Sequence, residues 1–502
     1  MPRRTYPEPL ATELFRPLDR NGPALLHDQL AERIRELLQR GNLRQGDYLP
    51  PLRLLAEKLD VSVGTIARAY DILTQSGVAA PHATRGVRIG EVSSPRSGPA
   101  WVRSVMRPVV PQDPLSVTFP RPQAADSIRF DVTEVASESI PAAILSRAVT
   151  GALDEGGALG YGPLDGMPSV QASLMEYLHR RGVAMDGATT VLTSGTTQSL
   201  VVLTHALVPP GGIVLVEQPT WHVALSVLAA ARVRVVAVPI DDEGIQLDAL
   251  RNAVLKFGPA FLYLQPSFQN PTGIALTSER RASLLEMARR LHLLVVEDDV
   301  AAELAFDTTP PPLRTEDGAD VVLYLKSFSK LLAPAVRLGL IVAPACYERP
   351  IREAKHGLDP FVSTLAQNIV AHCLKSRGFD RHRRSLAAEL KGRWEALREA
   401  LEELMPAGTR WTTPRGSLST WIEFPDGIAL SLLIADLAAR GVALSPGDLF
   451  CVEAIGLRSA RLAFGATPPA RIRRGVEIIA DSVRAHLRAG RQRPVAVRST
   501  AS

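Results

Sequence analysis

Val321-Val322-Leu323-Tyr324-Leu325-Lys326-Ser327-Phe328-Ser329-Lys330 is an apolar, β-rich run that ends in two serines and a lysine. A similar run, Leu293–Val296, is followed by three consecutive carboxylates, Glu297-Asp298-Asp299. From about residue 127 onward such runs alternate with helical stretches, which is typical of a mostly parallel sheet with crossover helices. The sequence therefore predicts an α/β fold. The expected strands are Thr190–Thr193, Ile213–Val216, Val233–Pro239, Ala260–Leu264, Leu293–Glu297 and Val321–Leu325.

The pattern changes after about residue 351. Long helical segments come first, and mixed strands and helices follow at Thr420–Phe424, Ala460–Phe464 and Arg471–Leu487. We therefore expect one domain over residues 128–488, with a large lobe at about 128–350 and a smaller α+β lobe at about 351–488. The tail, residues 489–502, holds arginines and no acidic residue, and we expect it to be disordered.

A different pattern occupies residues 1–90. A helical pattern runs through residues 23–40, and others follow at Leu52–Leu59 and from about Val63 to Ser76, the last with Ser62 as a good N-cap. Two short β-like pieces come next, near residues 78–81 and 86–89. Two helices joined by three residues and followed by a β-hairpin outline a winged helix-turn-helix. Residues 91–127 hold seven prolines and are expected to form a semi-stiff linker to the α/β domain.

The positive charge of the chain is concentrated near its N-terminus. Residues 1–110 hold 16 Lys and Arg against 11 Asp and Glu, whereas the remaining residues hold 41 of each. An excess of basic residues confined to the winged-helix part of the chain favours a nucleic-acid partner for that part.

The composition excludes several other classes of protein. The three cysteines of the 502-residue chain have no C-x-x-C spacing, so we expect neither a disulfide scaffold nor a metal site. The N-terminus lacks the apolar segment of a secretory signal, and no apolar run reaches the length of a membrane span. We therefore expect a cytoplasmic protein that has no membrane partner.

The N-terminal motif resembles a known family. Leu49-Pro50-Pro51-Leu52-Arg53, Val61-Ser62-Val63-Gly64-Thr65-Ile66-Ala67-Arg68 and Leu73-Thr74-Gln75-Ser76-Gly77 are similar to the GntR-type winged helix. The resemblance implies that the third helix enters the major groove of operator double-stranded DNA and that the wing reaches the minor groove. The implied DNA contacts are Arg53, Ser62, Gly64, Thr65, Arg68, Arg85 and Gly86. Val63 stands where the family usually has an arginine, and a winged helix used only for protein contacts is the alternative.

Five short motifs of the α/β region belong together. They are Ser194–Gln198, Glu217–Trp221, Asn270–Gly273, Glu297–Asp299, and Ser327–Lys330 with Arg337. The first follows a strand and opens a helix, where N–H groups and hydroxyls can hold a phosphate. In this order the five motifs resemble the fold-type I pyridoxal-phosphate enzymes, the class I aminotransferases, over about residues 128–488.

The second resemblance implies pyridoxal 5'-phosphate as the cofactor. Lys330 would form the Schiff base, because the cofactor aldehyde needs an amine, and Asp298 would hold the ring nitrogen protonated. Asn270 would hydrogen-bond the ring 3′-oxygen, and Trp221 would stack on the ring face. Arg461, in the motif Ala460–Phe464, would bind the carboxylate of an amino acid. The phosphate would be held by Thr196, Thr197, Ser327, Ser329, Arg337 and, from a partner subunit, Tyr161.

One departure from the aminotransferase pattern concerns the ring 3′-oxygen. Two or three residues after Asp298 those families place a tyrosine that hydrogen-bonds this oxygen, whereas the present chain has Val300 and Ala301. The loss of this donor favours a sensor over an efficient transaminase.

The order of the parts resembles the MocR subfamily of GntR-type bacterial regulators. The resemblance implies a head-to-tail homodimer that binds operator DNA, in the cytoplasm and associated with the nucleoid when DNA-bound. It implies that the large domain senses pyridoxal phosphate or a small amino acid or amine effector through Lys330. Two alternatives remain at this stage: a genuine aminotransferase acting on an amino acid, and a regulator that responds to an unrelated ligand without the cofactor.

Overall fold

The computed structural model describes residues 14–20, 25–39, 43, 47–75, 79–82, 86–89, 106–111, 113–114, 122, 126–155, 159–453 and 456–492. The chain divides into two units, Met1–Pro99 and Ala100–Ser502. The predicted wing residue Arg85, most of the predicted linker and residues 493–502 of the predicted disordered tail lie outside the described residues.

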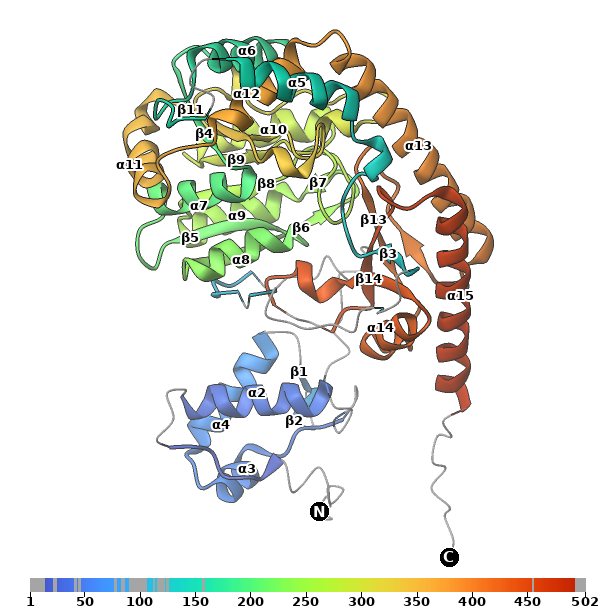
Figure 1. Cartoon of the computed structure of the whole chain (residues 1–502). Helices are drawn as coiled ribbons and strands as arrows, with labels where there is room; N and C mark the ends of the chain where they lie inside the picture. The colour runs from blue at the N-terminus through green and yellow to red at the C-terminus, as the bar shows by residue number, and fades with distance from the viewer. Residues whose placement is uncertain are drawn as a thin grey trace, which may run out of the picture. The chain divides into compact units, whose positions relative to one another are not determined.

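The first unit has the predicted winged-helix elements (Figure 1). Apolar residues recur three or four positions apart along each helix, so one face of each helix is buried. These faces share a core that includes Leu30, Ile34, Leu55, Ile66 and Leu73. The two strands pair antiparallel, with His82 opposite Gly86 at the end of the hairpin. The elements are α2 (Leu26–Gln39), α3 (Leu52–Leu59), α4 (Val63–Gln75), β1 (Ala79–His82) and β2 (Gly86–Ile89).

The second unit is built on an eight-stranded sheet with the order β4-β11-β10-β9-β8-β5-β6-β7. The strands from β10 to β6 are parallel, as the alternation of strands and helices predicted. The antiparallel β11, between β4 and β10, was not predicted. The strands are β4 (Ala188–Thr193), β5 (Ile213–Gln218), β6 (Arg234–Asp241), β7 (Gly244–Ile245), β8 (Phe261–Leu264), β9 (Val295–Asp298), β10 (Val322–Ser327) and β11 (Gly339–Pro344).

Both faces of this sheet are buried. Val214 and Val216 enter one apolar core and Leu215 enters another, so successive residues of a strand serve opposite faces. Helices enclose the sheet in Figure 1. They are α5 (Ala142–Asp154), α6 (Pro168–Arg180), α7 (Thr196–Leu207), α8 (His222–Ala230), α9 (Leu247–Phe257), α10 (Ser278–Arg290), α11 (Glu348–Leu358) and α12 (Thr364–Lys375).

A second sheet, with the order β12-β13-β15-β14-β3, forms the smaller α+β part. Its first strand in the chain, β3, pairs parallel with β14, and its Ile128 and Phe130 are buried in the core of this part. We placed the start of the large lobe at about residue 128, but the strand at that position belongs to the small sheet. The elements are β3 (Ile128–Phe130), β12 (Arg410–Trp411), β13 (Ser419–Glu423), β14 (Val442–Pro446), β15 (Ser459–Ala463), α13 (Phe379–Leu404), α14 (Leu430–Ala439) and α15 (Pro469–Gln492).

Part of the predicted linker lies against the second unit. Val109 forms an isolated antiparallel bridge with Val235 on β6, with backbone N–H···O distances of 2.9 and 2.6 Å. Arg107 pairs with Glu453 at 2.6 Å. Backbone hydrogen bonds and an ion pair therefore hold this stretch of the linker against the domain that follows it.

Candidate cofactor site

A pocket opens where β8 and β9 end and where the turn after β10 begins. It brings together three of the predicted residues, Asn270, Asp298 and Lys330. Val300 and Ala301, which stand where a tyrosine was expected from the resemblance, also line it. The full lining is Thr133, Gln265, Ser267, Phe268, Asn270, Asp298, Val300, Ala301, Leu304, Lys330, Ser417, Leu418 and Ser419.

Asp298, the last residue of β9, is fully buried, and only one of its two carboxylate oxygens has a hydrogen-bond partner among the described residues. Its Oδ2 accepts hydrogen bonds from the Tyr263 hydroxyl at 2.7 Å and from the Gln265 amide at 3.2 Å. Its Oδ1 is buried without a partner among the described residues. Burial raises the pKa of this carboxyl to about 6. A buried acceptor of this kind needs a donor, and the protonated ring nitrogen of pyridoxal phosphate would supply one.

Lys330 follows β10 after the turn that Ser327 begins. Its Nζ donates a hydrogen bond to the Thr133 carbonyl at 2.5 Å. Burial lowers the pKa of this amine, and the Glu134 carboxylate opposes the shift. A lysine with a lowered pKa is more often the neutral amine, which is the form that attacks an aldehyde. The side chain therefore suits the predicted role.

The predicted phosphate ligands surround one turn at the N-terminus of α7. Gly195 precedes the helix with a φ of 104°, a conformation that favours glycine, and Arg337 donates a hydrogen bond to the Ser194 carbonyl at 2.7 Å. A side chain on Gly339 would place its Cβ 2.7 Å from the Gly195 Cα, so two glycines allow β11 to approach this turn.

The hydroxyl groups lie beside the same turn. Thr196 and Thr197 are the first residues of α7, where the N–H groups at the start of the helix attract anions. Ser327 is the register partner of Gly339, and its hydroxyl lies 3.1 Å from that of Ser329. Hydroxyls, the N–H groups at the start of the helix and a guanidinium together form a suitable cradle for a phosphate.

Arg461 on β15 is a buried guanidinium beside the pocket residue Asn270. Its Nη1 lies 3.1 Å from the Asn270 Oδ1, its Nη2 donates to the Asp131 carbonyl at 2.7 Å, and its Nε has no partner among the described residues. The guanidinium also lies over the Phe450 ring at 4.8 Å. Burial lowers the pKa of Arg461 to about 10. No ion pair joins it to a carboxylate in the described part of the chain, so it can accept one from a ligand.

The structure places Trp221 and Tyr161 away from the pocket lining. Trp221 caps α8, is half-buried and packs against the core formed by α7 and α8. Tyr161 is 90% exposed, and its ring lies 5.0 Å from that of Phe361. Stacking by Trp221 and a contact from a partner's Tyr161 both remain predictions.

The implied DNA contacts lie around the start of α4. Arg53, Ser62, Gly64 and Arg68 are exposed, whereas Ile66 on the same helix is buried. The Ser62 hydroxyl accepts the Thr65 N–H at 3.0 Å, so Ser62 caps the helix as predicted. Thr65 is half-buried and its hydroxyl lies 2.9 Å from that of Ser62. Gly86 begins β2 on the wing.

Sequence reasoning missed the groups that support Asp298. Tyr263 and Gln265 are two residues apart along β8 and its continuation, so both side chains point to the face that Asp298 shares. This spacing was visible in the sequence as Tyr263-Leu264-Gln265. Without the pairing of β8 with β9, nothing indicated that these residues belonged to the site.

The fold and the site together define a fold-type I pyridoxal-phosphate domain joined to a DNA-binding winged helix. Residues 126–479 match the family "Aminotransferase class I and II", and residues 26–89 match "Bacterial regulatory proteins, gntR family". The chain belongs to the class I and II aminotransferase family, and its GntR domain gives it the MocR-type architecture. Pyridoxal phosphate is its cofactor.

The relatives are of two kinds. Aromatic-amino-acid aminotransferase 1 of Thermococcus litoralis is 31% identical, covering 70% of this chain and 87% of its own. The uncharacterized HTH-type transcriptional regulator YdfD of Bacillus subtilis is 27% identical, covering 85% and 90%. A solved multiple substrate aminotransferase from Thermococcus profundus is 30% identical, with a TM-score of 0.70 over 73% of this chain and 93% of its own. No helix in the described residues has the length and hydropathy needed to cross a membrane.

Proposed function

We propose that this protein is a transcriptional regulator whose aminotransferase-like domain senses pyridoxal phosphate, or an amino acid or amine that reacts with it, and alters operator binding. The observation that carries the proposal is the set of three groups in one site, the buried Asp298 and Arg461 and the half-buried Lys330. Asp298 has a free carboxylate oxygen, Lys330 has a lowered pKa, and Arg461 has no carboxylate partner among the described residues. This site is on the same chain as a DNA-binding domain. We assign residues 1–90 to that domain, 91–127 to the linker and 128–488 to the sensing domain.

Each residue of the site has one task in holding the cofactor. Thr196, Thr197, Ser327, Ser329 and Arg337 hold the phosphate, with Tyr161 added by a partner subunit. Asp298 would accept a hydrogen bond from the protonated ring nitrogen, Asn270 would hydrogen-bond the 3′-oxygen, and Trp221 would stack on the ring face. When bound, pyridoxal phosphate supplies an aldehyde that condenses reversibly with amines and a ring that withdraws electrons. Lys330 would be the protein's own amine for this aldehyde, and the amine of an effector would compete with it.

Arg461 gives the site its preference for a carboxylate-bearing effector. The hydrogen-bond partners of this guanidinium are neutral: the Asp131 carbonyl, the Asn270 amide oxygen and the Ser445 hydroxyl. An effector carboxylate would replace some of them with a charge-assisted bidentate pair. Arg461 lies on β15 of the small sheet and Lys330 follows β10 of the large one, so an effector that contacts both favours closure of the two lobes. A typical coupling free energy between effector binding and DNA binding, about 1–3 kcal/mol, would change operator affinity roughly 5–150-fold.

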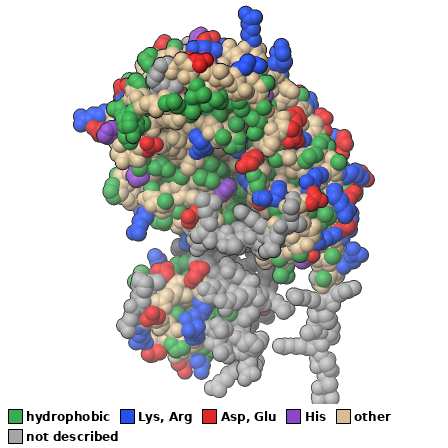
Figure 2. All heavy atoms as spheres, in the orientation of Figure 1, with side chains coloured by type: hydrophobic (Ala, Val, Ile, Leu, Met, Phe, Trp, Pro, Cys, Tyr) green, Lys and Arg blue, Asp and Glu red, His purple; other side chains and the backbone are tan. Residues whose placement is uncertain are grey.

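The proposed assembly is a head-to-tail homodimer, located in the cytoplasm and associated with the nucleoid when DNA-bound. Hydrophobic side chains gather on one face of the second unit in Figure 2. The strongly exposed hydrophobic residues in the neighbourhood of α5 and of the α11–α12 connection are Leu153, Leu159, Tyr161, Leu164, Leu358 and Phe361. Exposed apolar residues in such number support a protein partner there, and a second copy would bring its Tyr161 to the first.

The test measures operator affinity and turnover on the same protein. Duplex DNA is selected from a random pool with the full-length dimer, and its Kd is measured with pyridoxal phosphate and each common L-amino acid. The decarboxylated amine of each amino acid is the matched control. We expect amino acids that change the visible spectrum to change Kd, and Arg461→Gln to abolish the advantage of the amino acid over its amine. Unchanged operator affinity with every ligand would contradict the proposal.

An aminotransferase acting on an amino acid is the second candidate. The observation in its favour is the similarity to solved and curated aminotransferases, which covers 70% and 73% of the chain in two of the matches. Val300 and Ala301 line the pocket and offer no hydroxyl to the cofactor, which supports sensing. Steady-state transamination of an amino acid with a keto acid separates the two, because multiple turnover without any effect on DNA binding would favour the enzyme.

A further inference from the structure

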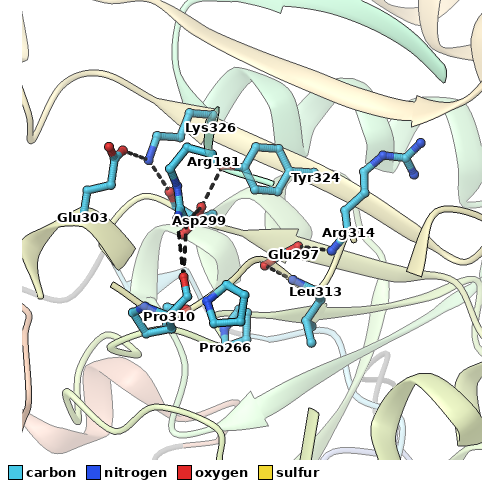
Figure 3. A network of polar contacts seen from close by, with 12 residues as sticks. Arg181, Pro266, Glu297, Asp299, Glu303, Pro310, Leu313, Arg314, Tyr324 and Lys326 are labelled. Carbon is cyan, nitrogen blue, oxygen red and sulfur yellow. Dashed lines mark hydrogen bonds and ion pairs between the residues drawn. The ribbon is translucent and has the colours of Figure 1, made fainter. Parts of the chain in front are cut away.

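Figure 3 shows a buried cluster of charged and phenolic side chains that includes Asp299 and Glu303, whose chain neighbours Asp298 and Leu304 line the pocket. Lys326 on β10 is fully buried, and its Nζ forms an ion pair with Glu303 at 2.8 Å and donates to the Asp299 carbonyl at 3.0 Å. Asp299 is in turn bound by Arg181 at 2.9 Å and by the Tyr324 hydroxyl at 2.7 Å. None of these residues has a part in the cofactor contacts described above.

The cluster holds the pocket wall from outside. The segment from Asp299 to Leu304 turns back on itself, and three of its side chains, Val300, Ala301 and Leu304, line the pocket. Lys326 contacts both ends of this segment, through the carbonyl of Asp299 and the carboxylate of Glu303. The Glu303 carboxylate also accepts a hydrogen bond from Tyr177 on α6. One ammonium group therefore sets the spacing between the two ends of the wall.

Stability alone does not account for such a cluster. Moving two ion pairs out of water costs several kcal/mol per ion, and well-packed apolar residues of similar volume are commonly as stable or more so. The cluster does impose a geometry, because each buried charge tolerates little displacement from its partner. The cluster fixes the conformation of the segment Asp299–Leu304, which directly follows Asp298 and forms part of the pocket wall.

We propose that Lys326 is a positioning residue, which fixes the wall segment Asp299–Leu304 and with it the neighbouring Asp298 against the cofactor ring. The inference rests on cofactor binding in this pocket. Lys326 has no contact with the cofactor in this proposal and acts only through the wall. Its charge also helps to hold the pKa of Asp298 down against burial, which supports the same role.

The experiment compares Lys326→Met with the double variant Lys326→Met/Glu303→Gln. The single variant leaves the Glu303 carboxylate buried without its cation, so we expect a lower Tm for the cofactor-free protein. The double variant removes both charges, and we expect its Tm to return toward wild type. If Lys326 positions the wall, the double variant still binds pyridoxal phosphate roughly tenfold or more weakly, because small displacements of contact groups are costly. We also expect the pH midpoint of the bound cofactor's absorbance to shift.

A matched control lies elsewhere in the second unit. Arg393 on α13 is buried and pairs with Glu389 at 2.6 Å, and neither residue lines the pocket. Arg393→Met/Glu389→Gln should change Tm without changing the cofactor Kd or the pH midpoint. Wild-type cofactor Kd and midpoint in the folded Lys326 double variant would overturn the inference.

Two further measurements keep the result unambiguous. If both Lys326 variants fail to fold, Glu303→Gln decides, since it weakens the same contact and keeps the shape of the side chain. A retained wild-type midpoint in that variant counts against the proposal. If the wild-type protein itself binds no pyridoxal phosphate, the proposed sensing function fails. If the wild type binds it and only the Lys326 variants bind it more weakly, the result concerns positioning.

Discussion

At the scale of single residues, three consecutive carboxylates at the end of β9 have different partners, because successive side chains of a strand point to opposite faces of the sheet. Glu297 and Asp299 face one side of the sheet, where backbone N–H groups bind the first and Arg181 and Tyr324 bind the second. Asp298 faces the other side and the pocket. Burial raises the pKa of Glu297 to about 7, whereas Lys326 and Arg181 outweigh burial and hold the pKa of Asp299 below its usual value. Of these three carboxylates, Asp298 is the one that lines the pocket.

Asp298 makes the cofactor-free protein less stable as the pH rises. Burial raises its pKa from 3.8 to about 6, so between these values the unfolded chain loses a proton that the folded chain keeps. Above about pH 6 the cost amounts to about 3 kcal/mol. We expect Asp298→Asn to raise the Tm of the cofactor-free protein at pH 7.5, with a smaller gain near pH 4, and to weaken pyridoxal phosphate binding.

Scanning calorimetry across this pH range checks the expectation. Asp299→Asn is the matched control and should lower Tm at pH 7.5, because Asp299 is ionised between two cations. If Asp298→Asn is less stable than the wild type at pH 7.5, the buried carboxylate of Asp298 does not destabilise the cofactor-free protein, and the expectation is wrong.

Lys330 is expected to be the amine that holds the cofactor. Borohydride treatment of the protein with pyridoxal phosphate should fix the cofactor mass to the peptide that contains Lys330, as read by mass spectrometry. Lys326, four residues earlier, is fully buried in an ion pair and serves as an internal control. A fixed adduct that persists in Lys330→Ala would show that another amine is used.

At the scale of elements, the helix α4 shows what the sequence alone can predict. Its apolar spacing, its N-cap at Ser62 and the turn before it are all local signals, and the structure has each of them. The same holds for the strands β4, β5, β6, β8, β9 and β10, whose apolar runs lie within a few residues of the predicted bounds, whereas the two-residue strand β7 was not predicted.

Elements whose place depends on distant partners were harder to predict. The sequence of β11 is an ordinary apolar run. It pairs antiparallel with β10, to which it is joined by the segment between Ser327 and Gly339 without a crossover α-helix. β3 joins a sheet whose other strands lie some three hundred residues later in the chain. In the site, Lys330, Asp298 and Asn270 were recognised by motif, whereas Tyr263, Gln265 and Lys326 act through pairings that no local pattern reports.

The exposed arginines of α3 and α4 should contribute to DNA affinity. We expect Arg53→Ala and Arg68→Ala each to weaken operator binding, and the salt dependence to become less steep if the contact is to phosphate. Kd measured at several salt concentrations distinguishes a phosphate contact from a base contact. Arg349→Ala, which removes an exposed charge from α11 in the other unit, is the control. Wild-type affinity in both variants would mean that the DNA-binding face lies elsewhere.

At the scale of the whole molecule, one short segment connects Arg461 to the linker. Phe450 contacts the Arg461 guanidinium, its carbonyl accepts the Thr220 N–H at 2.8 Å, and three residues later Glu453 pairs with Arg107. A ligand that changes the position of Arg461 therefore acts on a segment that also fastens the linker.

We expect the Arg107–Glu453 pair to carry part of the response of operator affinity to the effector. Glu453→Arg should reduce the ratio of operator Kd values measured with and without the amino acid that perturbs the spectrum. The double variant Arg107→Glu/Glu453→Arg should restore that ratio, because it reforms the pair with reversed charges. If the double variant behaves like the single one, the pair has no part in the coupling.

The bridge between Val109 and Val235 has a consequence for solubility. Among the described residues, β7 pairs with β6 only at Ile240 and Asp241, so the first half of β6 lies at an edge of the sheet. The strand reads Arg234-Val235-Val236-Ala237-Val238, an apolar and β-prone sequence of the kind that recruits strands from other molecules. Val109 occupies both backbone groups of Val235. We expect Val109→Pro, which removes one of these hydrogen bonds, to speed deuterium uptake at Val235 and to promote aggregation. That outcome would give the linker a second task, the protection of this strand edge from self-association.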